Sequence, residues 1–414
     1  MFSFTDTAFM VIAASLVMLM TPALAFFYGG LATKRNILGI MIQSFVSLGW
    51  STVLWFVCGY SLCFSGTMAE GTDWAGILGN LDKCFLHGVT IDSIHPSANG
   101  GIPEFVFISF QMMFAILTPA LITGAFVNRI NFKAYFIFLT LWQFFVYYPF
   151  AHMVWGGGLL AEWGVLDFAG GIAVHILAGF AALASVFFVG ARVDKNSTPN
   201  SIPLVAIGTG LLWFGWYGFN AGSELGVDSV TTLAFLNTDI AASFALITWL
   251  VIEWCRHRQP KLVGVLTGSI AGLATITPGA GYMPIWSAPI VGIVASVCCY
   301  LAVEWKNKRQ WDDAMDVWGV HGIGGFVGTI LLGIFATTAV NANGANGLIT
   351  GEGAFFFKQL VATIVSAIYG FVFTYVILWV INKVTPVRVS ESEEREGIDA
   401  SILGEHAYDK QDEL

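Results

Sequence analysis

Long stretches of this sequence carry no Asp, Glu, Lys or Arg and are mostly apolar. They cover residues 7–33, 36–69, 105–128, 134–161, 168–191, 196–223, 262–303, 317–351 and 359–382. A membrane-spanning helix needs about 20 consecutive apolar residues, so most of these stretches hold one helix each. The stretch 262–303 is long enough for two helices, with a turn predicted at Thr277-Pro278-Gly279-Ala280-Gly281.

The segment 229–252, which contains the acid Asp239, completes a set of eleven predicted helices. Only 11% of the residues are charged, whereas soluble domains carry about 25%. We therefore predict an all-α polytopic membrane protein with eleven transmembrane helices. Because this number is odd, the two termini are expected on opposite sides of the membrane.

The basic residues indicate the orientation of the helices. If the N-terminus lies outside, all 18 Lys and Arg residues except Lys83 and Lys358 fall on the inner side. Inner loops of membrane proteins are enriched in Lys and Arg, so we predict an N-out, C-in protein of the cell (plasma or inner) membrane. The outer side then carries the acids Asp6, Glu70, Asp73, Asp82, Asp92, Glu104, Glu162, Glu224, Asp228 and Glu352. These acids either concentrate small cations or collect there because bases are excluded.

The helices form two units of five, at about 7–191 and 202–338, followed by a closing helix at 354–382. With five helices per unit, the second unit enters the membrane upside down, which makes an inverted repeat. We predict that residues 1–382 form the transmembrane domain and that residues 383–414 form a polar cytoplasmic tail. The longest outer loop, at about 67–103, is expected to carry a short non-spanning helix.

One pattern, Val-His-x-x-x-Gly-Phe, occurs at Val174–Phe180 and again at Val320–Phe326. It places His175 and His321 at matching points of the two units. An ionisable residue inside a bilayer is by default a candidate for function. The interface between inverted repeats is where many transporters bind their substrate, so we expect the two histidines to meet near mid-membrane.

Each of these histidine helices is expected to begin near an acid, Asp167 in the first unit and Asp316 in the second. The glycines around both histidines allow close helix packing.

Two neutral imidazoles in an apolar interior restrict the possible chemistry. A bare cation would cost tens of kcal/mol to move there, and a metal-ion channel needs rings of carbonyl or carboxylate groups. Each neutral imidazole offers one donor and one acceptor. A line joined from Nδ1 to Nε2 therefore suits a small neutral polar molecule such as ammonia, or a proton hop. The six cysteines form no C-x-x-C pair, and we expect no cofactor, no metal and no nucleic-acid partner.

Six motifs, spread over nearly the whole chain, resemble those of the ammonium transporter (Amt/Mep/Rh) family, on the prokaryotic Amt side. The motifs lie at Gln111–Ala115, Ala151–Gly158, Asp167–His175, Gly215–Ser223, Thr277–Tyr282 and Asp316–Gly322. Any one of them alone is weak evidence, whereas together they are specific.

The resemblance implies a role for each matching residue. It implies an outer vestibule that recruits ammonium, two stacked rings that close the pore below it, twin pore histidines, and a buried aspartate that orders the vestibule. The residues are Phe114, Trp155, Ser223 and Trp216 for the vestibule, with Thr277 nearby, Phe114 and Phe219 for the gate, His175 and His321 for the pore, and Asp167 for the structural and electrostatic role. By itself, Asp167 could equally be an ordinary helix N-cap, and single aromatic residues usually face lipid or core.

The implied function is ammonium transport. Ammonium is recruited outside, loses its proton, and passes as ammonia between the histidines, with net charge movement. The alternatives are an ammonium sensor on the same scaffold, an electroneutral ammonia gas channel, or an enzyme using the histidines as an acid–base pair or metal site. The last would need carboxylate or cysteine companions at membrane depth, and only Asp239 is evident, so we predict that the protein is not an enzyme. The resemblance also implies a homotrimer. It further implies that the tail is regulatory and that a PII-type signalling protein docks near it at the cytoplasmic face. Without the resemblance, the tail would be interpreted as a solvated acidic segment.

Overall fold

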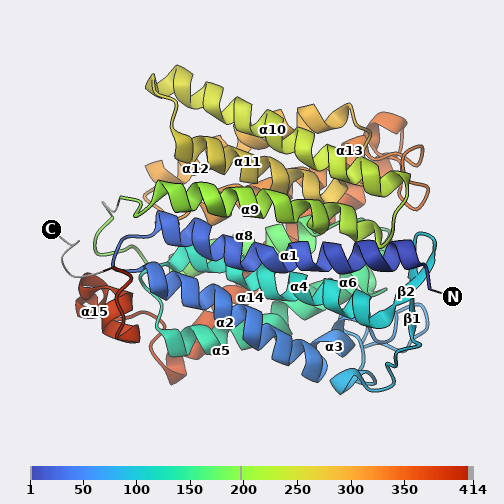
Figure 1. The fold of residues 1–414 in the computed structure, drawn as a ribbon, viewed down its shortest axis with the longest axis horizontal. Coiled ribbons are helices and arrows are strands. Elements are labelled where there is room, and N and C mark those ends of the chain that lie inside the picture. The colour runs from blue at the N-terminus through green and yellow to red at the C-terminus, as the bar shows by residue number, and fades with distance from the viewer. Residues whose placement is uncertain (1, 196–197, 409–414) are drawn as a thin grey trace.

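Long helices lie side by side along the longest axis of the molecule (Figure 1). The computed structural model describes residues 2–195 and 198–408, so residues 409–414 of the predicted tail lie outside the described part. The helices are α1 (Phe4–Leu31), α2 (Ile37–Leu54), α3 (Tyr60–Phe64), α4 (Glu104–Ile122), α5 (Phe132–Trp142), α6 (Tyr148–Trp155), α7 (Leu159–Trp163), α8 (Leu177–Val189), α9 (Ile202–Ala221), α10 (Ser229–His257), α11 (Leu262–Ile276), α12 (Ser287–Lys308), α13 (Ile323–Phe335), α14 (Gly353–Val384) and α15 (Glu391–Glu396).

Several of these helices join end to end into longer spans. Within the described ranges, eleven spans are long and apolar enough to cross a membrane, which confirms the predicted number. They run over Phe4–Leu31, Ile37–Phe64, Glu104–Phe126, Phe132–Trp163, Gly171–Val189, Ile202–Glu224, Ser229–His257, Leu262–Gly279, Ser287–Lys308, Trp318–Phe335 and Gly353–Val384. Helices satisfy their backbone polar groups internally, which is what a lipid environment requires. The turn predicted at residues 277–281 is present, because Thr277–Gly279 form a short 3-10 turn between α11 and α12.

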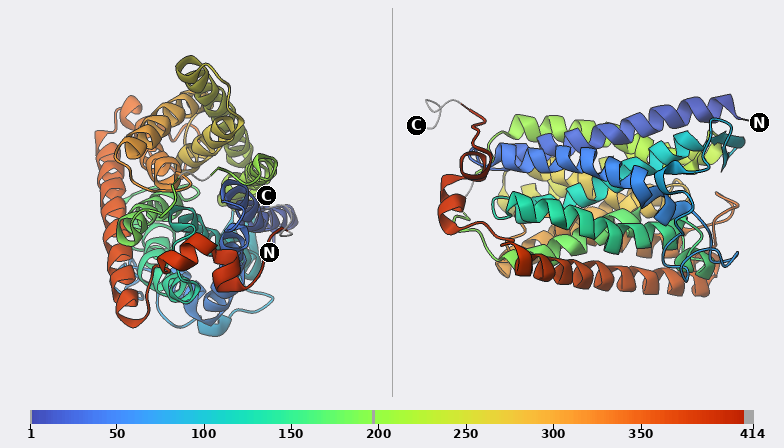
Figure 2. Two further views of the ribbon diagram at one scale, coloured as in Figure 1. Left: turned by 90° about the vertical axis from the view of Figure 1, so that its left-hand side faces the viewer. Right: turned by 90° about the horizontal axis from the view of Figure 1, so that it is seen from below.

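The long loop at about 67–103 contains a structure that the all-helical pattern did not indicate. It has a 3-10 turn at Cys84–Leu86 and an antiparallel hairpin of β1 (Ile94–Ser97) and β2 (Gly100–Pro103). The hairpin lies at the same end of the bundle as the start of α1, and α15 lies at the opposite end (Figures 1 and 2).

The two histidine segments pack reciprocally at the centre of the bundle. The π-helical turn η5 (Gly171–Ile176) contacts α13, and the π-helical turn η8 (Trp318–Gly322) contacts α8. Two units related by an inverted repeat would pack in this reciprocal way. The boundaries of the two repeats stay predictions.

The tail is docked against the end of the bundle. The Asp399 carboxylate accepts the backbone N–H groups of Ile37, Leu38 and Gly39 at 3.0, 3.1 and 2.7 Å. These are unpaired donors of the first turn of α2, so the tail caps that helix.

Candidate functional site

A small cavity opens at the end of the bundle that carries the hairpin. Its volume is about 150 Å³, and it is lined by Phe64, His95, Phe107, Gln111, Phe114, Trp155, Phe168, Ser223 and Leu225. Three residues that the resemblance assigned to one vestibule, Phe114, Trp155 and Ser223, therefore lie together. They come from α4, α6 and the short turn after α9.

Hydrogen bonds to the backbone hold two of these side chains in place. The Trp155 indole N–H donates to the carbonyl oxygen of Asp167 at 2.8 Å. The Ser223 hydroxyl donates to the carbonyl oxygen of Phe219 at 2.8 Å. Because the hydroxyl proton of Ser223 is used in this way, its oxygen is left as an acceptor beside the aromatic rings.

Two phenylalanine rings close the floor of the cavity. The ring centroids of Phe114 and Phe219 are 4.4 Å apart, tilted by 38°, and both side chains are buried. The ring of Phe219 is in turn stacked toward His175, with 6.0 Å between centroids. The expected gate pair therefore separates the cavity from the histidines.

The structure corrects the expected place of Trp216. This residue does not line the aromatic cavity at the hairpin end but lies one layer deeper, with its ring 5.5 Å from that of His175. Its indole N–H donates to the Thr277 hydroxyl at 2.9 Å. This bond directs the Trp216 ring against the histidine layer, and Thr277 acts as the anchor of that ring.

His175 and His321 face each other at the centre of the bundle. Their Nδ1 atoms are 3.3 Å apart, and the rings are 5.2 Å apart and nearly parallel, at 18°. The Nδ1–Nε2 line that we expected is therefore wrong, because the rings meet through the same nitrogen on each. One Nδ1 must carry a proton and the other must accept it. Among the described residues, the buried Nε2 of His175 has no hydrogen-bond partner.

A second cavity begins on the other side of the histidine pair. It holds about 70 Å³ and reaches His321, with walls formed by Phe27, Tyr28, Leu31, Val263, Thr267, Ile270, Ala314, Met315, Asp316 and Val320. The twin imidazoles thus lie between the aromatic cavity at the hairpin end of the bundle and this second cavity.

The π-helical turn of His175 is capped by Asp167. Its carboxylate accepts the backbone N–H groups of Gly170, Gly171, Ile172 and Ala173 at 2.6–3.1 Å. Burial raises the pKa of Asp167, while these four donors oppose the shift. The N-cap interpretation is therefore correct for the carboxylate, and the carbonyl of the same residue holds Trp155.

The second turn begins directly after Asp316, as predicted, but the carboxylate that caps it belongs to Asp313. The Asp313 carboxylate accepts the N–H groups of Val317 and Trp318 at 3.1 and 2.8 Å, whereas Asp316 pairs with Lys306 at 2.7 Å. Sequence spacing could have identified Asp313, because it precedes His321 by the same interval by which Asp167 precedes His175.

Glycines bring the two histidine segments into direct contact. A Cβ atom on Gly179 would lie 2.1 Å from the Gly322 Cα, and one on Gly325 would lie 2.7 Å from the His175 Cβ. Larger residues at these positions would separate the imidazoles.

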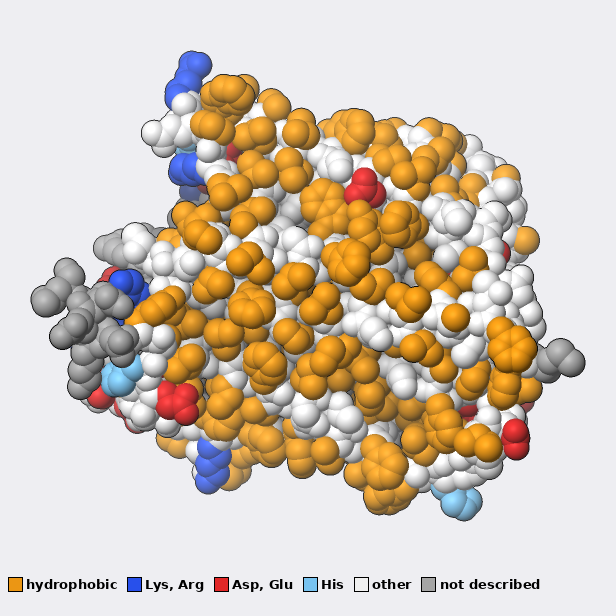
Figure 3. Space-filling view, in the orientation of Figure 1, with side chains coloured by type: hydrophobic (Ala, Val, Ile, Leu, Met, Phe, Trp, Pro, Cys, Tyr) orange, Lys and Arg blue, Asp and Glu red, His pale blue; other side chains and the backbone are white. Residues whose placement is uncertain are grey.

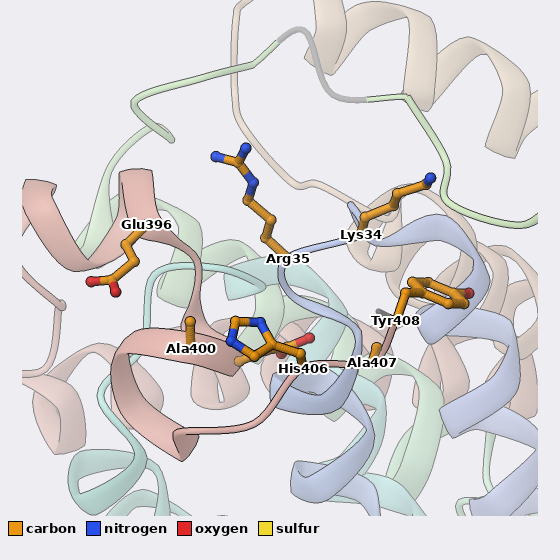
Figure 4. A pocket seen from close by; sticks show the side chains of 8 residues that line it. Lys34, Arg35, Glu396, Ala400, His406, Ala407 and Tyr408 are labelled. Carbon is orange, nitrogen blue, oxygen red and sulfur yellow. The ribbon is translucent and has the colours of Figure 1, made fainter. Parts of the chain in front are cut away.

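At the tail end, another cavity of about 240 Å³ lies between the α1–α2 loop and the tail (Figure 4). Lys34 and Arg35 come from the loop, and Glu396, Ala400, His406, Ala407 and Tyr408 come from the tail. The Lys34 ammonium lies 5.9 Å from the Tyr408 ring centroid, so this contact joins the two segments.

Residues 8–408 match the Ammonium Transporter Family. The chain belongs to this family. It is 42% identical to an ammonium transporter of Bacillus subtilis, over 97% of this chain and 98% of the relative. The crystal structure of Candida albicans Mep2 is similar with a TM-score of 0.86 and 35% identity, covering 95% of this chain and 88% of that one. A structure titled "Sensor Amt Protein" matches with a TM-score of 0.86 and 26% identity, covering 96% and 98%.

The family and the Bacillus subtilis relative are named for ammonium transport, and this family member is not an enzyme. Within the described ranges, no group of three or more His, Cys, Asp or Glu side chains is placed to hold a metal ion.

Proposed function

We propose that this protein moves ammonium across the cell membrane by recruiting the cation outside and passing ammonia between the twin histidines. The observation that carries this proposal is the pair of imidazoles joined at 3.3 Å between two cavities. The relatives named as ammonium transporters support the choice of substrate.

Recruitment takes place in the outer cavity. The Trp155 and Phe114 faces attract a cation by about 0.5–2 kcal/mol, and the Ser223 oxygen accepts one of its N–H groups. Because the hydrogen bond to Asp167 already fixes the Trp155 indole, the ring does not have to be ordered when the cation binds to its face.

Deprotonation precedes passage through the gate. Ammonium is about as weak an acid as a lysine side chain, with a pKa of about 10, but a bare cation between the buried Phe114 and Phe219 rings would cost tens of kcal/mol. Losing the proton removes this cost. Neutral ammonia can then hydrogen-bond to the Nε2 of His175, which needs a partner in the buried layer. The proton released by ammonium is taken up by the Nε2 of His175, while the Nδ1 of His175 passes its proton to the Nδ1 of His321 and the Nε2 of His321 releases one on the other side. Because a proton crosses together with each ammonia molecule, this transport is electrogenic.

Charge-translocation recording on reconstituted proteoliposomes tests this proposal. An ammonium jump should give a sustained current in the wild type and little or none in His175→Ala or His321→Ala, with His87→Ala as a control on the exposed outer loop. Flux without current would indicate the electroneutral gas channel instead.

The second candidate is an ammonium sensor. Two observations favour it, namely the similar structure titled as a sensor and the tail docked on α2. A small saturable transient without sustained flux, together with an ammonium-dependent change in tail accessibility, would support this function.

We also propose the N-out, C-in orientation. On the face shown in Figure 3, Lys and Arg side chains gather at the end that carries α15, while hydrophobic side chains cover the middle. In a variant whose six native cysteines are replaced, single cysteines at Lys83 and Lys308 should react with an impermeant thiol reagent from outside and inside, respectively.

We further propose a homotrimer. Asp239 is the eleventh residue of α10 and lies roughly 15 Å along the helix from its start, partly exposed on the bundle surface, with its carboxylate accepting the Tyr217 hydroxyl at 2.6 Å. Charged residues at membrane depth normally face protein, so a neighbouring subunit on this face accounts for Asp239. Native mass spectrometry in mild detergent should give a trimer.

A PII-type protein is the partner we propose at the inner face, beside the docked tail. Co-purification with such a protein, compared between the full chain and a chain ending at residue 384, tests this partner.

A further inference from the structure

His95 is a side chain of the outer cavity that the sequence motifs did not indicate. It lies on β1 of the outer hairpin, and it lines the same cavity as Phe114, Trp155 and Ser223. A histidine in this cavity matters because the proposed substrate is a cation with four N–H donors.

The hairpin that carries His95 is firmly attached to the bundle. The Asp6 carboxylate of α1 accepts the Ser97 hydroxyl at 2.7 Å, the Asn99 backbone N–H at 3.0 Å and the Val227 N–H at 3.0 Å. Asp6 is fully buried. The cavity wall formed by His95 is therefore tied to two other elements.

The imidazole is also held in one orientation. Its ring stacks on Phe107 with 3.6 Å between centroids and 9° between planes, and Phe107 packs edge-on against Phe64 at 5.0 Å. All three rings line the cavity.

One hydrogen bond decides which nitrogen of His95 carries the proton. Nδ1 lies 2.8 Å from the carbonyl oxygen of Pro96. A carbonyl oxygen has no proton to give, so Nδ1 is the donor. The neutral ring therefore keeps a lone pair on Nε2.

The charged groups near His95 come from two other elements. Glu104 of α4 pairs with Lys83 of the outer loop at 2.6 Å and also accepts the Tyr60 hydroxyl at 2.5 Å. Burial lowers the pKa of His95 and Lys83 adds to this, whereas the Pro96 carbonyl and Glu104 oppose it. The ring is thus neutral at pH 7 and gains a positive charge only under acidic conditions.

We propose that His95 is a positioning residue of the outer ammonium site, accepting an N–H of the bound cation and repelling the cation once the imidazole is protonated. This inference rests on the proposed function. Between pH 7.5 and 5, ammonium itself stays protonated, because its pKa is about 10. An acid-dependent loss of affinity therefore reports on the protein and not on the supply of substrate.

The test measures the ammonium concentration for half-maximal current at pH 7.5 and at pH 5 in proteoliposomes. His95→Phe keeps the stack but removes the acceptor. We expect its half-saturation concentration at pH 7.5 to rise about threefold to tenfold, the range of an ordinary hydrogen bond. His95→Gln keeps an acceptor oxygen without a titrating group, so its value at pH 7.5 should stay close to the wild type. Its rise at pH 5 should be smaller than that of the wild type, and what remains comes from Glu224 beside Ser223, because burial raises the pKa of Glu224 to about 7. His87→Gln, on the exposed part of the same loop, should behave as the wild type at both pH values.

Three results would overturn the inference. They are unchanged half-saturation in His95→Phe, an acid-dependent rise in His95→Gln equal to that of the wild type, or a lower maximal current with unchanged half-saturation. The last would mean that His95 only supports the fold. If the wild type itself gives neither current nor flux, the proposed function fails, which is a distinguishable outcome.

Discussion

The carbonyl oxygen of Asp167 accepts the indole N–H of Trp155 at 2.8 Å. The carboxylate of the same residue caps the turn that carries His175. One buried residue thus fixes both Trp155 in the cavity wall and the turn that carries His175.

We expect Asp167→Asn to destabilise the protein and reduce transport. The amide nitrogen of Asn cannot accept, so two of the four capped N–H groups lose their partner, and each buried unsatisfied donor costs about 1–3 kcal/mol. The melting temperature in detergent and the ammonium current should both fall. Asp92→Asn, at an exposed position of the outer loop, is the control, and equal behaviour of the two variants would contradict the capping role.

Trp155→Leu should weaken recruitment of ammonium. Loss of the cation–π interaction, about 0.5–2 kcal/mol, corresponds to a rise of about twofold to thirtyfold in the half-saturation concentration. Discrimination against other monovalent cations should fall as well. Trp163→Leu is the matched control, because Trp163 is 38% exposed on the nearby α7, and a similar rise in this variant would argue against a specific site.

Gly179→Ala should separate the histidine segments. The added Cβ would lie 2.1 Å from the Gly322 Cα, and overpacking of a tight contact costs about 1–3 kcal/mol or more. We expect a lower melting temperature and a loss of current. Gly210→Ala adds the same methyl group on α9, where it meets no described heavy atom within 4 Å, and it should be neutral or slightly stabilising. Full activity of Gly179→Ala would show that the contact can relax.

Asp399→Ala should release the tail. The change removes the acceptor of three N–H groups at the start of α2, so limited proteolysis should cut the tail faster than in the wild type. Glu391→Ala alters an exposed acid of α15 and serves as the control. Unchanged cleavage of Asp399→Ala would mean that other contacts hold the tail.

Local sequence patterns were sufficient to predict the membrane helices. Each span is long enough and apolar enough to be recognised alone, and even the turn at Thr277–Gly279 was marked by its own Pro and Gly residues. The motifs also singled out Phe114, which lines the aromatic cavity, and His175 and His321, which meet below it.

Other features depended on contacts between distant segments. Trp216 took its depth from the bond to Thr277, and His95 reached the cavity through a hairpin held by Asp6. The sequence indicated only Asp316, the acid nearest to the start of the second histidine helix. Its side chain pairs with Lys306, and the cap is Asp313, three residues earlier.

The amino-acid sequence alone determined that this chain spans the membrane eleven times and carries twin histidines on matched helices, since transfer into lipid depends on the local content of apolar and charged groups. Tertiary structure decided which nitrogen atoms of the imidazoles meet and which side chains complete the outer cavity. Both depend on the orientation of the rings and on distances of a few ångström between residues that are far apart in the chain. Close glycine packing and single hydrogen bonds fix these distances only after the helices have packed.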